Sequence, residues 1–111
     1  MDAESLRIDE KEPMTVEDIA RLVELVMNDR RAKIYLFGSH ARNQASIESD
    51  IDLVVESSDA LITLELMSAI EEILGDDENF KCQAITTKQL SKSDEEFRKS
   101  VETDMMLIYN R

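Results

Sequence analysis

Residues 34–56 read IYLFGSHARNQASIESDIDLVVE, and this stretch decides the fold. The apolar run at residues 33–37 is short and rich in β-prone residues, so it predicts a strand. Gly38 and Ser39 end that strand, and the polar residues 40–49 predict a loop or one short helical turn. A strand that exits through a glycine and a serine is therefore the first expected feature of the fold.

A second strand is predicted over residues 50–56, because apolar and polar residues alternate there. One face carries Ile51, Leu53 and Val55, and the other carries Asp50, Asp52, Val54 and Glu56. Residues i and i+2 of a strand project from one face about 6.6–6.8 Å apart. Asp50 and Asp52 can therefore share one metal ion or bracket a pair. The alternative explanation is a solvated polar face on a half-covered sheet.

Helical patterns flank the two strands. Before the first strand, Pro13 and Thr15 open a helix, with Thr15 as N-cap and Asp18 as its capping-box partner. After the second strand, a capping cluster at residues 57–59 opens another helix, which ends at Gly75. Both carry an apolar stripe with the helical period, so we expect both to pack on a core.

The last third of the chain predicts one more strand and one more helix. Residues 80–86 are the strand, and Ser93 with Glu96 forms a capping-box pattern that opens the helix. The apolar tail at residues 105–109 either continues that helix or adds an edge strand. The order predicts an α/β fold of the α+β type, a small mixed sheet with helices packed on one face.

Length and composition narrow the function classes. The 111 residues fit a flexible arm at residues 1–12 and a single domain at residues 13–111. No apolar run approaches the roughly 20 residues of a membrane span, and no secretory signal is visible. The lone Cys82 cannot form an internal disulfide. Together these features predict a cytoplasmic protein with no membrane contact.

The net charge of −12 comes from 25 acidic against 13 basic residues. A surface with this balance repels a phosphate backbone, so we expect no direct nucleic-acid substrate. It suits a basic protein partner instead. The alternative is that the acids only maintain solubility.

The glycine-serine pair becomes informative beside the two aspartates. Gly38 lets backbone N–H groups approach a phosphate closely, and the Ser39 hydroxyl can donate to a phosphate oxygen. Alone, such a pair is an ordinary turn. The spacing G-S-x10-D-x-D, however, arises by chance in a chain of this length on the order of once in a thousand sequences. Phosphate contacts beside paired carboxylates are what magnesium-dependent nucleotidyl transfer requires.

The stretch resembles the small nucleotidyltransferases of the DNA polymerase β superfamily. The closer likeness is to the minimal type called MNT, found in prokaryotes beside HEPN-family proteins. That pattern is G-S-x-A-R-G, a spacer, then S-D-I-D-L, and residues 93–109 are similar to the family's closing helix. The matching residues are Gly38, Ser39, Ala41, Arg42, Ser49, Asp50, Ile51, Asp52 and Leu53.

The resemblance implies a polymerase β-type fold and Mg²⁺-dependent transfer of AMP from ATP to a hydroxyl of a HEPN-type partner encoded nearby, as in a type VII-like antitoxin. It assigns the triphosphate to Gly38 and Ser39, and catalysis and the magnesium ions to Asp50 and Asp52. Two neighbours stay less defined: Arg42 either contacts phosphate or is solvated, and His40 is expected to be solvated. Self-association of the chain stays open.

Two positions depart from the pattern. Asn43 replaces a glycine, and asparagine tolerates the positive φ that such a position needs. Gln83 stands where the family carries a third carboxylate, and residues 80–93 contain no Asp or Glu. Losing a group that helps to move a proton commonly reduces the rate by about 10²–10⁴-fold. Cys82 and Ala84 are expected to point into the core.

Three hypotheses therefore remain. The chain is a working transferase, a degenerate nucleotidyltransferase that neutralises its partner by binding alone, or an unrelated α/β domain with an accidental motif.

Overall fold

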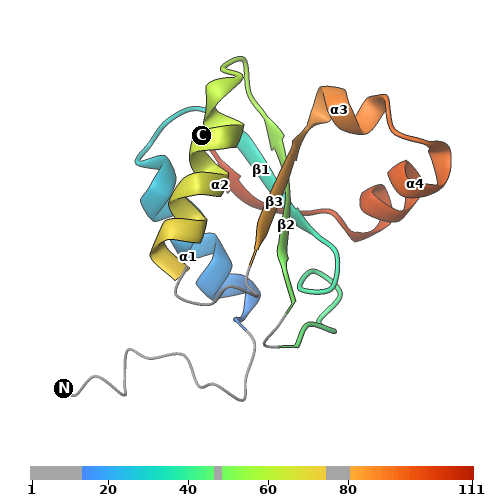
Figure 1. Ribbon diagram of the computed structural model, residues 1–111, viewed down its shortest axis with the longest axis horizontal. Helices are drawn as coiled ribbons and strands as arrows, with labels where there is room; N and C mark the ends of the chain where they lie inside the picture. Colours follow the sequence, from blue (N-terminus) through green and yellow to red (C-terminus); the bar gives the residue numbers. More distant parts are fainter. Residues whose placement is uncertain (1–13, 47–48, 75–80) are drawn as a thin grey trace.

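A single mixed sheet organises the protein, whose computed structural model describes residues 14–46, 49–74 and 81–111 (Figure 1). Its strands are β1 (Lys33–Phe37), β2 (Ile51–Glu56), β3 (Cys82–Thr86) and β4 (Met106–Asn110), in the order β3-β2-β1-β4. Strand β1 runs antiparallel to β2 and β4, whereas β2 and β3 are parallel. The predicted mixed sheet is confirmed, and the apolar tail forms its edge strand.

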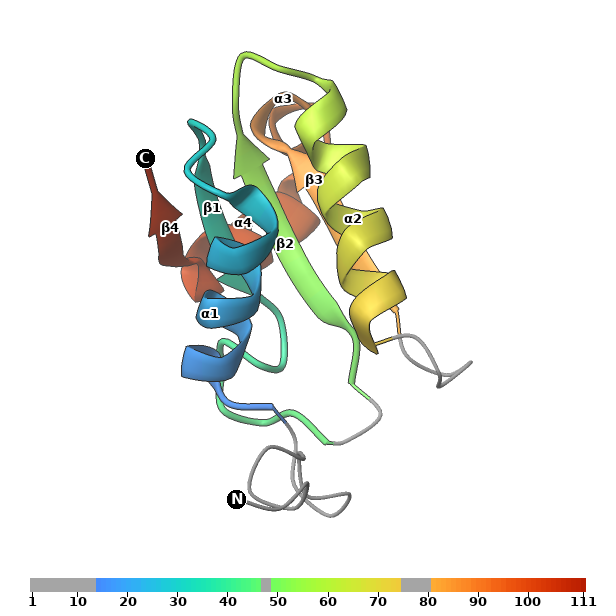
Figure 2. The same ribbon diagram turned by 90° about the vertical axis from the view of Figure 1, so that its left-hand side faces the viewer.

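Two long helices, α1 (Val16–Met27) and α2 (Leu61–Leu74), lie side by side on one face of this sheet (Figure 2). The main core lies between them and the sheet, because the alternate residues of β1 and β2 that face the helices are apolar. Fully buried members include Ile19, Val23, Ile34, Leu36, Ile51, Leu53, Leu66 and Ile70. The predicted alternation of β2 is thus the feature that fixes which face is covered.

The opposite face is also partly covered, by α3 (Thr87–Ser91) and α4 (Glu95–Asp104) (Figure 1). Val54 is fully buried there with Phe37, Leu90 and Val101. The prediction of helices on one face therefore holds for α1 and α2, but it did not include α3 and α4 on the other face. In the sequence Val54 shares the outward face of the strand with Asp50, Asp52 and Glu56. The sequence did not predict that these helices bury it.

The predicted N-terminal capping residues are confirmed for α1 and wrong for α4. The side chains of Thr15 and Asp18 each accept the other residue's backbone N–H at 3.1 Å, so the predicted capping box exists. The last helix begins instead with Asp94 as its N-cap, which accepts the Phe97 N–H at 2.8 Å. The Ser93 hydroxyl donates to Gln89 and closes the short helix α3, which had not been predicted.

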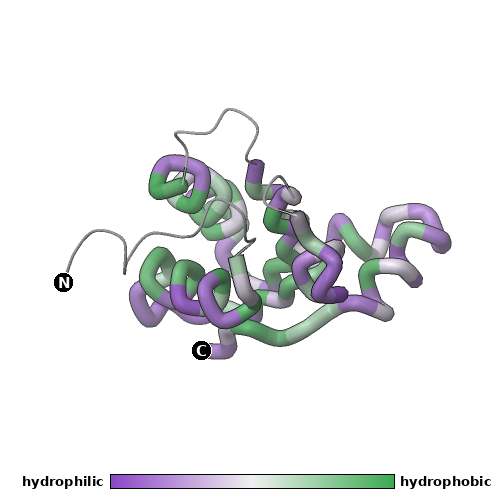
Figure 3. The backbone as a smooth tube through the Cα atoms, turned by 90° about the horizontal axis from the view of Figure 1, so that it is seen from below, coloured by the Kyte–Doolittle hydropathy of each residue, from purple (hydrophilic) through white to green (hydrophobic). Residues whose placement is uncertain are grey.

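Figure 3 shows hydrophilic and hydrophobic residues alternating around the helices, as expected for amphipathic helices that flank a sheet. No helix in the described ranges is long and apolar enough to cross a membrane. The predicted arm at residues 1–12, the helix end at Gly75 and the strand start at Phe80 lie outside the described residues.

Candidate functional site

The site begins where β1 ends, in a compact turn over residues 38–44. The Arg42 N–H donates to the Gly38 carbonyl at 3.1 Å, and the Gln44 N–H donates to the Ser39 carbonyl at 2.9 Å. These bonds close a tight turn, so the polar stretch begins with a hydrogen-bonded turn and forms no regular helix within its described residues. Asn43 has φ of 59°, so the residue that replaces the family glycine adopts the left-handed backbone that asparagine tolerates.

Gly38 brings this turn against the D-x-D strand. Its φ is +79°, and a Cβ placed on it would lie 2.4 Å from Oδ2 of Asp52. The contact arises because β1 and β2 pair with Phe37 opposite Asp52. The glycine is therefore needed for two reasons: its backbone conformation, and the room it leaves for the Asp52 carboxylate.

Burial and the neighbouring Asp50 perturb the pKa of Asp52. Burial, and then the charge of Asp50, raise the pKa of Asp52 from 3.8 to about 6, although His40 and Arg42 pull it downward. Two carboxylates that repel each other at a half-buried position are stabilised by a cation placed between them. Their hard oxygen atoms fit Mg²⁺, and the missing Cβ of Gly38 leaves the room that the Asp52 carboxylate itself occupies.

Gln83 lies beside Asp52, at the position where the family resemblance places a third carboxylate. Strands β2 and β3 pair in parallel with Asp52 opposite Gln83, and Gln83 is exposed. Within the described parts of the chain, no group of three or more His, Cys, Asp or Glu residues is arranged to hold a metal ion. The position next to the carboxylate pair thus offers a neutral amide oxygen.

The flanking residues of β3 face the core, as expected. Cys82 and Ala84 are both buried. Burial, followed by the charges of Glu71, Asp52 and Asp50, raises the pKa of the Cys82 thiol to about 12. Cys82 is therefore an unreactive core residue.

His40 corrects the sequence prediction, because it is buried, with 5% of its surface exposed. Its Nε2 lies 3.3 Å from the carbonyl oxygen of Ser49, and since a carbonyl only accepts, Nε2 carries the hydrogen. Nδ1 has no hydrogen-bond partner among the described residues. The ring therefore connects the turn to the segment that leads into Asp50, a contact nine residues along the chain that the loop sequence did not indicate.

Arg42 joins the turn to the end of α4. Its Nη1 lies 2.5 Å from Oδ2 of Asp104, and its Nε donates to Gln44 at 3.2 Å. The Arg42 side chain is 43% exposed, whereas that of Asp104 is 11% exposed. Asp104 escaped sequence reasoning because an acid at a helix end has no local pattern that points to a partner 62 residues away.

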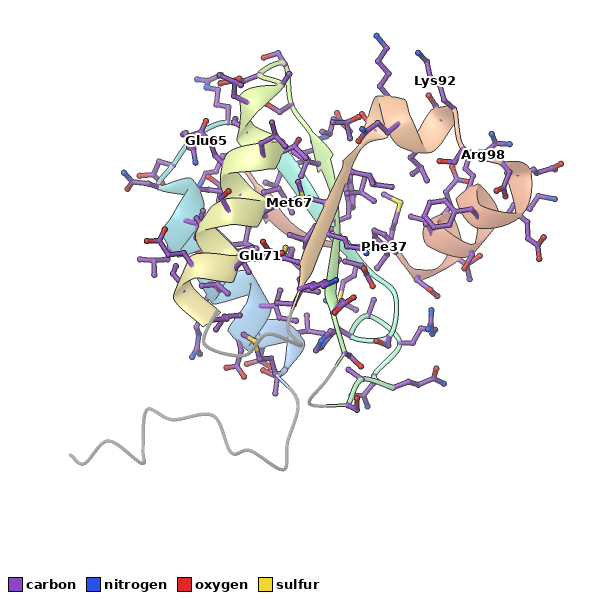
Figure 4. All side chains as sticks on the ribbon, in the orientation of Figure 1. Phe37, Glu65, Met67, Glu71, Lys92 and Arg98 are labelled. Atoms are coloured by element: carbon purple, nitrogen blue, oxygen red, sulfur yellow. The ribbon has the colours of Figure 1, made fainter. Side chains whose placement is uncertain are left out.

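Phe37 lies at the same end of the sheet, on the face that α4 covers. In Figure 4 it lies on the α4 side of the sheet, whereas Met67 and Glu71 lie on the α2 side. Its ring meets that of Phe97 edge-on, with centroids 6.3 Å apart and an interplanar angle of 87°. This packing and the Arg42–Asp104 ion pair hold α4 beside the turn.

Residues 20–111 match the family model described as Polymerase beta, Nucleotidyltransferase. A candidate protein adenylyltransferase of Methanocaldococcus jannaschii is 32% identical over 100 residues, which cover 84% of this chain and 94% of that protein.

Two solved structures share the fold at lower identity. A toxin–antitoxin solved with AMP-PNP aligns with a TM-score of 0.57 at 20% identity, over 88% of this chain and 75% of that chain. A mutant of the toxin–antitoxin MntA–HpeT aligns with a TM-score of 0.54 at 18% identity, over the same shares of the two chains. Because the family match spans most of the chain, an accidental motif is excluded, and this protein belongs to the polymerase β family of nucleotidyltransferases.

Proposed function

We propose that this protein transfers AMP from ATP to a hydroxyl group of a partner protein in a Mg²⁺-dependent reaction. The observation that carries the proposal is the contact between the Gly38 backbone and the Asp52 carboxylate. It joins a glycine-serine turn suited to phosphate with a carboxylate pair suited to a divalent cation. Nucleotidyl transfer requires these two elements side by side.

Each residue has a role in this proposal. Backbone N–H groups of the turn at Gly38 and the hydroxyl of Ser39 hold the triphosphate, and Asp50 and Asp52 hold Mg²⁺. When bound, Mg²⁺ neutralises phosphate charge and favours departure of pyrophosphate. Arg42 is already paired with Asp104, so it acts mainly by fixing the turn, with its exposed part free to approach a phosphate.

The relatives and the charge of the chain support a protein partner. The M. jannaschii relative is named as a candidate protein adenylyltransferase, and both solved neighbours are toxin–antitoxin proteins, one of them with an ATP analogue. A chain with net charge −12 favours a basic protein as acceptor. We therefore place the acceptor hydroxyl on a HEPN-type toxin encoded nearby, with this chain as its cytoplasmic, type VII-like antitoxin.

A second function, neutralisation by binding alone, is favoured by Gln83. Its amide oxygen can touch a metal ion but cannot take a proton from the acceptor hydroxyl at neutral pH. If the reaction depends on such a proton acceptor, the rate falls by about 10²–10⁴-fold. The fold and the partner surface would then persist without useful catalysis.

Labelled ATP, Mg²⁺ and the product of the adjacent gene separate the two functions. We expect wild type to label the partner, the Asp50→Asn/Asp52→Asn variant to fail, and Gln83→Asp to label it faster. Glu56→Gln is the matched control, because Glu56 is an exposed acid on the same strand and leaves the carboxylate pair intact. Labelling by Gln83→Asp but not by wild type would favour binding alone. Labelling by the double Asn variant would refute the assigned site.

A further inference from the structure

The start of β4 leaves apolar side chains exposed on an open sheet edge. In the described part of the chain β4 pairs only with β1, and its residues Met106–Asn110 include no charge. Met106 is 40% and Leu107 is 47% exposed. Proteins normally protect such an edge with charged residues, proline, a β-bulge or a covering segment. The register between β1 and β4 shifts between Ile34 and Tyr35, and Met106 and Leu107 lie on the side of that shift next to the end of β1. An uncharged edge with exposed apolar residues fits an interaction surface.

This edge lies next to the proposed transfer site. The antiparallel register places Met106 opposite Leu36 and Leu107 opposite Tyr35, so β4 starts beside the end of β1 that leads into Gly38. Two residues before Met106, Asp104 forms its ion pair with Arg42 of the turn. A segment bound along the start of β4 would therefore end close to the glycine-serine turn.

The charges of the chain and of the residues near β4 decide which kind of partner fits this edge. The chain carries a net charge of −12, and the acidic Glu102 precedes the apolar start of the strand, whereas the charge of the nearby Asp104 is already compensated by Arg42. At the far end, Arg111 lies 3.5 Å from Glu24 and 3.4 Å from Asp29, so its charge is already compensated. A second copy of this chain would bring like charges together, whereas a cationic segment would be attracted.

We infer that the start of β4 is the docking edge for the acceptor protein, which adds a positively charged, extended segment as a further strand. Its backbone pairs with β4, and its apolar side chains pack on Met106 and Leu107, as in other cases of strand addition. Docking there brings the acceptor hydroxyl toward Asp50 and Asp52. The inference rests on the proposed function for the purpose of the contact, but the contact itself is measured without catalysis.

The test measures equilibrium binding of the purified product of the adjacent gene, by calorimetry without ATP. We expect Leu107→Glu to weaken binding by at least about 10-fold, as loss of a central apolar contact does. Leu107→Met should bind within about 2-fold of wild type, because it retains the apolar contact. Leu61→Glu is the matched control, since Leu61 is 62% exposed on α2 and lies away from the edge. Thermal unfolding verifies that each variant is folded.

Several results would overturn the docking edge. These are unchanged binding by Leu107→Glu, equal weakening by Leu61→Glu, no complex with wild type, or a wild-type dimer in sedimentation that Leu107→Glu dissociates. Binding that does not weaken with added salt would refute the cationic character of the segment. If wild type binds but transfers no label, the transferase proposal fails and the docking edge stands. If Leu107→Glu labels the partner as wild type does, the docking edge fails and the transferase proposal stands.

Discussion

Replacing Gly38 by alanine tests the contact that joins the turn to the D-x-D strand. At φ of +79° an alanine is disfavoured by about 1–2 kcal/mol relative to glycine. Its Cβ would also lie 2.4 Å from Oδ2 of Asp52, so the carboxylate must move by at least 0.6 Å to restore a separation of 3.0 Å. Forcing that side chain off its rotamer adds about 0.5–1.5 kcal/mol.

We therefore expect Gly38→Ala to lower the free energy of unfolding by about 1.5–3.5 kcal/mol. For a domain near 100 residues, each kcal/mol corresponds to about 4–8 °C in Tm, so Tm should fall by roughly 6 °C or more. Urea unfolding followed by circular dichroism measures the free energy. Calorimetric titration with Mn²⁺ measures the carboxylate site, whose affinity should fall because the Asp52 carboxylate is displaced.

A double-mutant cycle separates the backbone contribution from the contact with Asp52. Asp52→Ala keeps the Cβ, which lies 3.4 Å from the new methyl group and makes an ordinary contact. In that background Gly38→Ala should destabilise by only the backbone part, about 1–2 kcal/mol. If Gly38→Ala lowers the free energy of unfolding equally in wild type and in Asp52→Ala, the carboxylate does not lie against Gly38. If Gly38→Ala lowers the free energy of unfolding by less than about 0.5 kcal/mol in both proteins, the backbone at Gly38 is not left-handed.

Other predictions concern charge and packing around the same site. Because the pKa of Asp52 rises from 3.8 to about 6, the folded state binds more protons than the unfolded chain between these pH values, and stability falls as pH rises through this window. Without divalent cations, Asp52→Asn should therefore raise Tm at pH 7 and leave it unchanged below about pH 4; an equal gain at both would refute the shift. A cycle of Arg42→Ala and Asp104→Ala should give a coupling of about 1 kcal/mol in urea unfolding, since the pair is half-buried, and a coupling near zero would contradict the ion pair. Tyr109→Phe should lower the free energy of unfolding by about 1 kcal/mol, because the Tyr109 hydroxyl donates to the Arg30 carbonyl at 2.7 Å, and an unchanged thermal midpoint would argue against that bond.

Local patterns predicted most of the site's framework. Alternation over residues 50–56 predicted which side chains of β2 face the core. Once the family resemblance had assigned Gln83 to the third-acid position, alternation also pointed Cys82 and Ala84 into the core. These inferences succeeded because a strand's two-residue period needs no knowledge of distant contacts. The positive φ at Asn43 was also predictable, since few residue types tolerate that backbone.

The features that sequence reasoning missed depend on contacts between segments that no local pattern marks. His40 is buried with its ring against the Ser49 carbonyl, nine residues along the chain, and Arg42 is held by Asp104 at the end of the last helix. Nothing in a run of polar loop residues distinguishes a solvated side chain from one that another segment covers. Asp94 rather than Ser93 caps α4 because α3 recruits the Ser93 hydroxyl, and α3 itself was too short to give a periodic pattern.

The position of Gln83 links stability to activity. With only two acids, burial and mutual repulsion already raise the pKa of Asp52 to about 6. A third carboxylate opposite Asp52 in the register would add further repulsion whenever the cation is absent. A neutral amide avoids that cost in the empty site, and for the same reason it attracts the cation less strongly and takes no proton. Gln83→Asp should therefore lower stability without Mg²⁺ and tighten Mg²⁺ binding, so the two effects of one substitution must have opposite signs if Gln83 belongs to the site.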